Sequence, residues 1–290
     1  MKIRDILAQK RTLSFEMFPP KGDLSVETAL EVGGELAQLG PDFVSVTYSA
    51  GGSGNSANTS VIASRLQQEA GVTTMAHLTC MGMHASDVDL FMDDLSKGGV
   101  ENVLALRGDA VPGREPVDFA YASDLIAYLR RRCGDRVCIG AACYPEGHVA
   151  CLDFRRSIEH LKAKQDAGAD FFVTQLFFDN ELYYRFREAA DAAGITVPIV
   201  VGIMPFTSQS QVTRMTFTCG ATLPSPVIKR LARYADDPEA LRKIGVEYAC
   251  EQLCDLAHHG VAGLHVYAMN KPAVAANAVA ALRAVGYLSA

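Results

Sequence analysis

Residues 102–109 read NVLALRGD, a short aliphatic run that ends in an arginine, a glycine and an aspartate. Runs rich in β-branched and aromatic residues recur about every 30 residues, and nearly all end in a polar or ionisable cluster. A strand of a buried parallel sheet is apolar along its length. Polar groups at the carboxyl ends of successive strands are what an enzyme built on a (β/α)8 barrel needs, because its active site forms on that face. The runs begin at eight positions: Thr12, Phe43, Thr73, Asn102, Val137, Phe171, Pro198 and Gly263.

Helical patterns separate these runs. Apolar residues of the segment 88–95 follow the i, i+3, i+4, i+7 spacing of one helix face. Ser25 is expected to cap the start of another helix and Gly40 to follow its end, and Asp153 is expected to open a further one. Strand and helix in alternation imply parallel strands joined by right-handed crossovers.

The interval between the seventh and eighth runs is unusually long. It contains helical patterns over residues 209–217, 227–234 and 238–259 and no ninth strand. No linker divides the chain, so we predict one domain over residues 1–290. The predicted fold class is α/β, a (β/α)8 TIM barrel with extra helices between strands 7 and 8. An open doubly wound sheet is the rival, but the eight strands and the missing G-x-G-x-x-G fingerprint weigh against it.

Composition argues against several classes of protein. The formal net charge of −6 disfavours a nucleic-acid or anionic-membrane surface, because both need a basic patch. No apolar run approaches the roughly 18 residues of a spanning helix, and the start lacks a secretory signal, so a cytoplasmic location is expected. The eight cysteines are expected to be free thiols, since a hydrophobic fraction of 49% supplies a core without disulfides.

Glu16 lies at the end of the first run, among phenylalanine and methionine residues. Desolvation disfavours the charged form of such a carboxylate, which suits a general acid. A structural ion pair with an arginine or lysine at the barrel mouth is the alternative. The position at the end of a strand favours the catalytic role.

Arg107, Gly108 and Asp109 end the fourth run. Arginine offers a rigid fork of donors, and glycine lets another group approach the backbone closely. Asp109 supplies a fixed negative charge. A simple Arg–Asp pair is the alternative interpretation, but together with Glu16 these residues make a site with two carboxylates and a cation.

His77 ends the third run, and Tyr144 and His148 follow the fifth. Two histidines and a tyrosine on one face indicate a pocket for a large ligand. A metal site needs ligands that converge, and His77, His148 and Glu146 could supply them. We favour the cofactor pocket.

Two further strand ends carry polar groups. Residues 47–54, TYSAGGSG, form a loop whose N–H groups can wrap a phosphate or ribityl chain, although the P-loop signature is missing. Gln175 ends the sixth run, and a carboxamide that both donates and accepts suits the edge of a heterocycle such as a pterin. No lysine ends an early or middle strand, so a Schiff-base aldolase is not expected.

Taken together, these motifs resemble the methylenetetrahydrofolate reductase family in its bacterial single-domain form, over nearly the whole chain. The resemblance implies an enzyme of one-carbon metabolism and methionine biosynthesis. Such an enzyme binds FAD non-covalently and reduces 5,10-methylenetetrahydrofolate to 5-methyltetrahydrofolate. The segments that carry the resemblance are SFEMFPP at 14–20, VTY at 46–48, HLTC at 77–80, LRGD at 106–109, YPEGH at 144–148, TQLFFD at 174–179, GIMP at 202–205 and LHVYAMN at 264–270.

The resemblance also assigns roles to residues. Glu16 would be the general acid that protonates N10 of the folate, and Asp109 would lie near the flavin ring and the folate. Gln175 and Gln211 would bind the pterin, and Lys271 would contact the rest of the substrate. The residues that would contact FAD are Thr47, His77, Arg107, Gly108, Asp109, Tyr121, Ala122, Tyr144, His148 and Lys164.

Some positions depart from the family pattern. Lys271 stands where the family often has an arginine, and lysine cannot make the bidentate fork. Met215 replaces an aromatic residue that stacks on ligands in some relatives. Ser157 and His160 replace polar contacts near the adenosine end of the cofactor.

The resemblance implies hydride transfer with ping-pong kinetics, with electrons from NADH, NADPH or a redox partner protein. A homo-oligomer is expected. Three other functions remain open. The chain could be a flavin barrel that oxidises a small amine or amino acid, as proline dehydrogenases do. It could be a flavin- or folate-binding subunit active only within a complex, or a metal-dependent barrel hydrolase.

Overall fold

The computed structural model describes residues 1–20, 25–48, 56–109 and 115–288. Eight parallel strands pair in chain order, and β8 pairs with β1 to close a barrel. This arrangement confirms the predicted (β/α)8 fold, and every strand begins within one residue of the predicted position. The strands are β1 (Thr12–Met17), β2 (Phe43–Val46), β3 (Thr74–Thr79), β4 (Asn102–Leu106), β5 (Cys138–Cys143), β6 (Phe171–Thr174), β7 (Ile199–Ile203) and β8 (Gly263–Tyr267).

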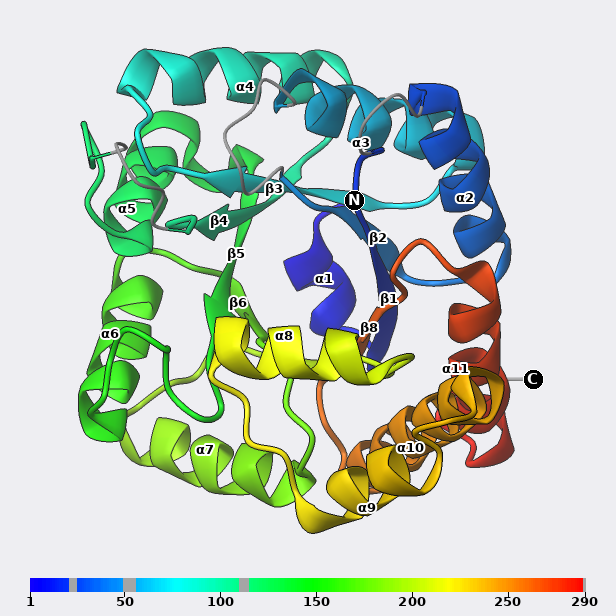
Figure 1. Ribbon diagram of the computed structural model, residues 1–290. Coiled ribbons are helices and arrows are strands. Elements are labelled where there is room, and N and C mark those ends of the chain that lie inside the picture. Colours follow the sequence, from blue (N-terminus) through cyan, green and yellow to red (C-terminus); the bar gives the residue numbers. More distant parts are fainter. Residues whose placement is uncertain (21–24, 49–55, 110–114, 289–290) are drawn as a thin grey trace.

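Helices surround the ring of strands (Figure 1). The predicted caps are confirmed: the hydroxyl of Ser25 accepts from the N–H of Thr28, and the Asp153 carboxylate accepts from Arg155. The helices of the outer ring are α2 (Val26–Gln38), α3 (Ser56–Ala70), α4 (Ala85–Lys97), α5 (Ala122–Cys133), α6 (Phe154–Asp166), α7 (Asn180–Ala192), α10 (Pro238–His258) and α11 (Pro272–Ala284). A short 3-10 helix, η1 (Gly134–Arg136), follows α5.

A short first helix, α1 (Ile3–Leu7), closes the amino-terminal end of the barrel. Ile3 is fully buried in a cluster with inward-facing residues such as Phe43 and Phe171. The N–H of Ile3 donates to Oδ1 of Asn102, the first residue of β4, at 2.8 Å. The helix thus covers the end of the barrel opposite the carboxyl ends of the strands.

Successive residues of β1 face opposite sides of the barrel wall, as the strand period of two requires. Leu13, Phe15 and Met17 pack in the large cluster between strands and outer helices. The residues between them, Ser14 and Glu16, turn to the interior. The sequence of β1 therefore places a carboxylate inside the barrel, near its open end.

Three helices lie between β7 and β8, as predicted: α8 (Gln209–Cys219), α9 (Ser225–Arg233) and α10. Helix α8 crosses the view of the strands in Figure 1. The segment after its carboxyl end contacts the loop after β5, where the N–H of Thr222 donates to both carboxylate oxygens of Glu146 at 3.1 and 3.0 Å. The helix thus bounds one side of the open end of the barrel. None of the helices within the described ranges is long and apolar enough to cross a membrane.

Candidate active site

Glu16 lies between two imidazoles inside the open end of the barrel. Its Oε2 is 3.5 Å from Nε2 of His77 on β3 and 3.7 Å from Nε2 of His265 on β8. The Glu16 side chain is 21% exposed, whereas those of His77 and His265 are 8% and 1% exposed. The carboxyl group therefore has a buried side that faces the two rings and a side that faces the opening.

His265 is a site residue that sequence reasoning missed. Its Nδ1 lies 2.7 Å from the hydroxyl of Ser14, and its Nε2 lies 3.4 Å from the hydroxyl of Ser45. The ring stacks on Phe43, with centroids 6.1 Å apart and an interplanar angle of 17°. A signal was present: His265 and Tyr267 alternate along the strand with Leu264 and Val266, which pack toward the outer helices, so both polar rings face the interior.

His77 is held in its neutral form. Burial lowers the pKa of His77 to about 4, the charge of Glu16 opposes this shift, and His265 adds to it. Its buried Nε2 has no hydrogen-bond partner among the described residues. A buried polar atom without a partner is uncommon in proteins, so this nitrogen is suited to a bound ligand.

Tyr267 follows His265 on the same face of β8 and spans the barrel. Its hydroxyl donates to the carbonyl of Thr174 at 2.6 Å. A side chain on Gly202 would collide with this tyrosine, since a Cβ there would lie 2.6 Å from the hydroxyl and 2.7 Å from the Thr174 carbonyl. Burial raises the pKa of Tyr267 well above its usual value.

Arg107 and Asp109 follow β4, which pairs with β3, the strand of His77. The buried Nε of Arg107 has no hydrogen-bond partner among the described residues, and its guanidinium lies 6.0 Å from the ring of Tyr121. Gly108 adopts φ +86°, and a Cβ there would lie 3.0 Å from the Cβ of Thr79, so the turn requires glycine. Asp109 is exposed. Burial raises the pKa of Cys219 at the end of α8 to about 11, and the negative charge of Asp109 adds to the shift.

Tyr144, His148 and Lys164 form a second group, at the end of β5. The rings of Tyr144 and His148 meet edge to face with centroids 4.7 Å apart, and Lys164 Nζ lies 5.2 Å from the Tyr144 ring. Lys164 donates to the carbonyl of Ala142 at 2.7 Å. Burial lowers the pKa of Lys164 to about 8. Burial also lowers the pKa of His148, and the cations Lys164 and Arg107 add to that shift.

The predicted folate-binding residues differ in the hydrogen bonds that they make within the protein. Gln175 accepts from the N–H of Leu176 through Oε1 at 2.9 Å. Gln211 is buried, and its Oε1 accepts from the N–H and the hydroxyl of Thr207 at 2.7 and 2.8 Å. Lys271 is exposed at the start of α11.

The remaining predicted cofactor contacts lie on the same side of the barrel. Thr47 directly follows β2, and its carbonyl accepts from the hydroxyl of Thr59 at 3.0 Å. Tyr121 is 62% exposed at the start of α5, and Ala122 behind it is buried. Residues 49–54 of the predicted phosphate loop lie outside the described residues.

No group of three His, Cys, Asp or Glu side chains that could hold a metal ion occurs within the described ranges. Glu146, a ligand in the metal alternative, is engaged with the backbone of Thr222. All eight cysteines are free thiols.

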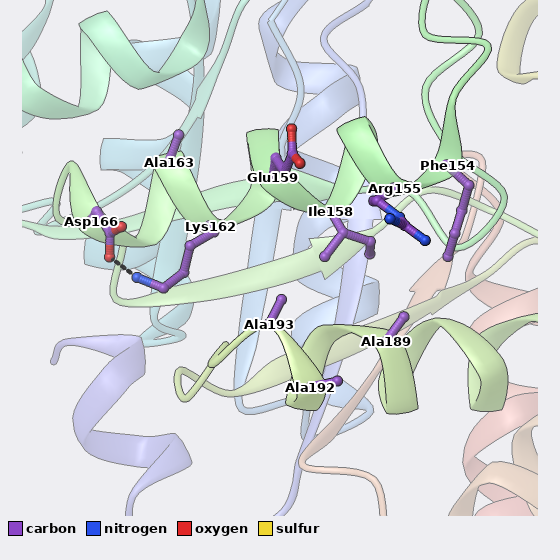
Figure 2. Close-up of a pocket in the computed structure, with 10 residues that line it drawn as sticks. All are labelled: Phe154, Arg155, Ile158, Glu159, Lys162, Ala163, Asp166, Ala189, Ala192 and Ala193. Atoms are coloured by element: carbon purple, nitrogen blue, oxygen red, sulfur yellow. Dashed lines mark hydrogen bonds and ion pairs between the residues drawn. The ribbon is translucent and has the colours of Figure 1, made fainter.

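A groove on the outer surface lies away from this site, between α6 and α7 (Figure 2). It is lined mainly by apolar side chains such as Ile158 and Ala189, with Lys162 and Asp166 paired along α6. None of the predicted site residues lines it.

The polar side chains at the carboxyl ends of the strands suit a cofactor with hydrogen-bond acceptors and negative charge. Two buried nitrogens, Arg107 Nε and His77 Nε2, lack partners among the described residues. Lys164 adds a half-buried cation, and Tyr121 and Tyr144 add aromatic surfaces. This donor set suits a flavin dinucleotide, whose ring accepts hydrogen bonds and whose pyrophosphate is anionic.

The sequence model of the methylenetetrahydrofolate reductase family matches residues 2–283. The 5,10-methylenetetrahydrofolate reductase of Escherichia coli is 32% identical over 259 residues, which cover 89% of this chain and 86% of that protein. Methylenetetrahydrofolate reductase (NADH) 1 of Arabidopsis thaliana is 36% identical over 284 residues, covering 93% of this chain and 48% of the plant protein. The chain thus spans about half the length of the plant relative.

Among solved structures, an uncharacterized protein from Clostridium thermocellum superimposes with a TM-score of 0.68 at 15% identity, covering 99% of this chain and 100% of that one. That protein is described as binding two copies of 5-methyl-5,6,7,8-tetrahydrofolic acid. At this identity the likeness supports the fold alone. The family match over nearly the whole chain, joined to the placement of its motifs at one end of an eight-stranded barrel, shows that the chain belongs to the methylenetetrahydrofolate reductase family.

Proposed function

We propose that this chain reduces 5,10-methylenetetrahydrofolate to 5-methyltetrahydrofolate with non-covalently bound FAD. The observation that carries the proposal is the Glu16 carboxyl group at the open end of the barrel, with one oxygen facing His77 and His265. Family membership supports the same reaction, since relatives from bacteria, plants and fungi are named methylenetetrahydrofolate reductase.

Glu16 is the proton donor in this proposal. The five-membered ring of the substrate must open before its one-carbon unit can accept a hydride, and opening requires a proton on N10. A positioned carboxylic acid delivers that proton directly or through one water. His77 is neutral at physiological pH, so its ring presents no full positive charge to the acid.

Arg107, His77 and Lys164 would hold the cofactor. The unpartnered Nε of Arg107 and Nε2 of His77 supply hydrogen bonds, and Lys164 supplies positive charge. When bound, the flavin supplies the hydride that the protein side chains cannot provide. Further contacts are proposed for Thr47, Gly108, Asp109, Tyr121, Ala122, Tyr144 and His148.

Gln175 is the proposed pterin contact. Its Oε1 accepts from the N–H of Leu176, and its NH₂ group is the proposed donor to the pterin. Gln211 is bound within its own helix start, so its proposed role is to shape the pocket next to Gln175. Exposed Lys271 would contact the outer part of the folate.

We propose that a nicotinamide nucleotide or a redox protein supplies the electrons. This donor and the folate would react with the flavin one after the other, giving ping-pong kinetics. The names of relatives include NADH in Arabidopsis thaliana and NADPH in Caenorhabditis elegans. We also expect a homo-oligomer, which light scattering measures directly.

The test is an anaerobic titration of the purified protein, followed by its visible spectrum. We expect a yellow protein that is bleached by NADH, NADPH or a chemical reductant and regains its colour on addition of methylenetetrahydrofolate. Release by denaturation should yield FAD. Reduced flavin that methylenetetrahydrofolate does not reoxidise would contradict the proposal, and so would a folded protein with only FMN or no flavin.

A further inference from the structure

His265 lies beside the proposed acid although it ends no strand. We propose that His265 is a positioning residue: its imidazole holds one oxygen of Glu16 inside the barrel and changes tautomer with the protonation state of the acid. This inference rests on the proposed function, because that function makes Glu16 the proton donor.

The ring of His265 is fixed on several sides. Ser14 contacts Nδ1 and Ser45 contacts Nε2, at 2.7 and 3.4 Å. Phe43 stacks on one face, and Tyr267 meets the ring edge to face with centroids 5.4 Å apart. A fully buried ring with these neighbours cannot swing away, so its Nε2 stays next to both the Ser45 hydroxyl and the Glu16 carboxyl group.

Both imidazoles approach the same oxygen of Glu16. Oε2 lies 3.5 Å from His77 and 3.7 Å from His265, so neither contact is a hydrogen bond in the structure as it stands. A small rotation of the Glu16 side chain toward His265 would make one. The other oxygen, Oε1, is the one that we propose faces the substrate.

Ser14 allows His265 to adopt either neutral tautomer. The Ser14 hydroxyl lies 2.7 Å from Nδ1 and 3.2 Å from the carbonyl of Leu264, and it donates to only one of them at a time. When it donates to Nδ1, the hydrogen of the imidazole is on Nε2 and faces an ionised Glu16. When it donates to Leu264, Nδ1–H donates to Ser14, and Nε2 accepts from a protonated Glu16.

The titratable groups that face His265 are Glu16, His77 and Tyr267. Burial lowers the pKa of His77 to about 4 and raises the pKa of Tyr267 well above its ordinary value. Both are therefore uncharged at neutral pH, and the Tyr267 hydroxyl is already committed to Thr174. Glu16 is thus the neighbour whose protonation His265 can follow.

Two amide variants, His265→Gln and His265→Asn, separate the contributions of the two ring nitrogens. His265→Gln keeps a polar group near the Nε2 position, whereas His265→Asn keeps only the Ser14 side. We expect His265→Asn to slow the folate half-reaction about ten- to a hundredfold, the range for losing one hydrogen bond to a charged group, and to shift its pH profile. His265→Gln should recover part of the rate. Reduction of the flavin by its donor should change by no more than a few-fold in both variants.

His258→Asn, at the exposed end of α10, is the matched control and should leave both half-reactions unchanged. A His265→Asn variant with a wild-type folate half-reaction and pH profile would overturn the inference. Wild-type protein that does not reduce methylenetetrahydrofolate would instead overturn the proposed function, so the two failures are distinguishable.

A second measurement does not depend on activity or on the stability of a His265 variant. In wild-type protein with isotope-labelled histidine, nuclear magnetic resonance should show the hydrogen of the His265 ring moving between its nitrogens as pH changes. In Glu16→Gln, which cannot ionise, the tautomer should stay constant over the same range. The same response in both proteins, or a fixed tautomer in both, would contradict the proposed coupling.

Discussion

Asn270 holds the chain just beyond Glu16 by binding the backbone of Phe18 on both sides. Its Oδ1 accepts from the N–H of Phe18 and its Nδ2 donates to the carbonyl of Phe18, each at 2.9 Å. Asn270 itself adopts φ +52°, a left-handed conformation that asparagine tolerates better than most residues. The end of β8 thereby fixes the exit of β1, two residues after the proposed acid.

Asn270→Ala should lower the free energy of unfolding by about 1–3 kcal/mol, because two hydrogen bonds are lost and alanine is strained at positive φ. Asn270→Gly removes the same hydrogen bonds without the strain, so it should be less destabilised. Chemical denaturation compares the two variants with the wild type. If Asn270→Ala is as stable as the wild type, the clamp on Phe18 contributes nothing to the fold.

Gly202 makes room for Tyr267 to cross the barrel. Gly202→Ala would place a methyl group 2.6 Å from the tyrosine hydroxyl, and we expect a loss of about 1–3 kcal/mol, the usual cost of overpacking a core. Gly34→Ala is the control, because a Cβ at this position in α2 meets nothing within 4 Å and alanine favours a helix. Thermal unfolding should show Gly202→Ala below the wild type and Gly34→Ala at or above it. Equal melting temperatures for the two variants would argue against the close approach.

Buried His77 should make stability depend on pH. Its pKa is about 4 in the folded protein and 6.5 when unperturbed, so between these values the unfolded chain binds a proton that the folded protein does not. The free energy of unfolding should therefore fall as pH drops from about 6.5 to about 4, by up to about 1.4 kcal/mol per pH unit from this residue. Urea unfolding at several pH values gives the free energy of unfolding as a function of pH. The slope of this function should be shallower for His77→Gln than for the wild type. Identical slopes would mean that His77 is not buried in its neutral form.

Cofactor binding should depend on the charge of Lys164. The pKa of this amine is lowered to about 8, so above that pH the free protein presents a neutral amine to an anionic cofactor. The dissociation constant of FAD should rise by up to about tenfold per pH unit above pH 8, the limit for one linked proton. Lys164→Arg should bind FAD without this pH dependence, because the guanidinium stays charged. Fluorescence titration measures this dissociation constant at each pH. A dissociation constant that does not change with pH in the wild type would mean that Lys164 lies away from the cofactor.

The strands could be predicted from sequence because their signal is local. Each apolar run is bounded by polar or turn residues, and all eight starts lie within one residue of the observed positions. The helices between β7 and β8 were predicted for the same reason, although α9 begins at Ser225, two residues before the predicted start of its pattern. The polar strand ends led to Glu16, His77 and Arg107, because in a parallel barrel the carboxyl ends of all strands lie on one side.

The partners of these residues could not be predicted in the same way. His265 contacts Ser14 because β8 pairs with β1 in a register that sets these two residues opposite each other. This register follows from closure of the whole barrel, which no local pattern encodes. Lys164 on α6 contacts the carbonyl of Ala142 and the ring of Tyr144, which are far from it in sequence. A helical pattern alone does not show which of its residues makes such a contact.

In the proposed reaction, Glu16 donates a proton to the folate. Stopped-flow measurement of both half-reactions in Glu16→Gln tests it most directly. We predict a folded protein that keeps its flavin and is reduced by its donor at close to the wild-type rate, but reoxidises with methylenetetrahydrofolate about 10²- to 10⁴-fold more slowly, the usual contribution of general acid catalysis. A folate half-reaction within a few-fold of the wild type would remove Glu16 from the mechanism.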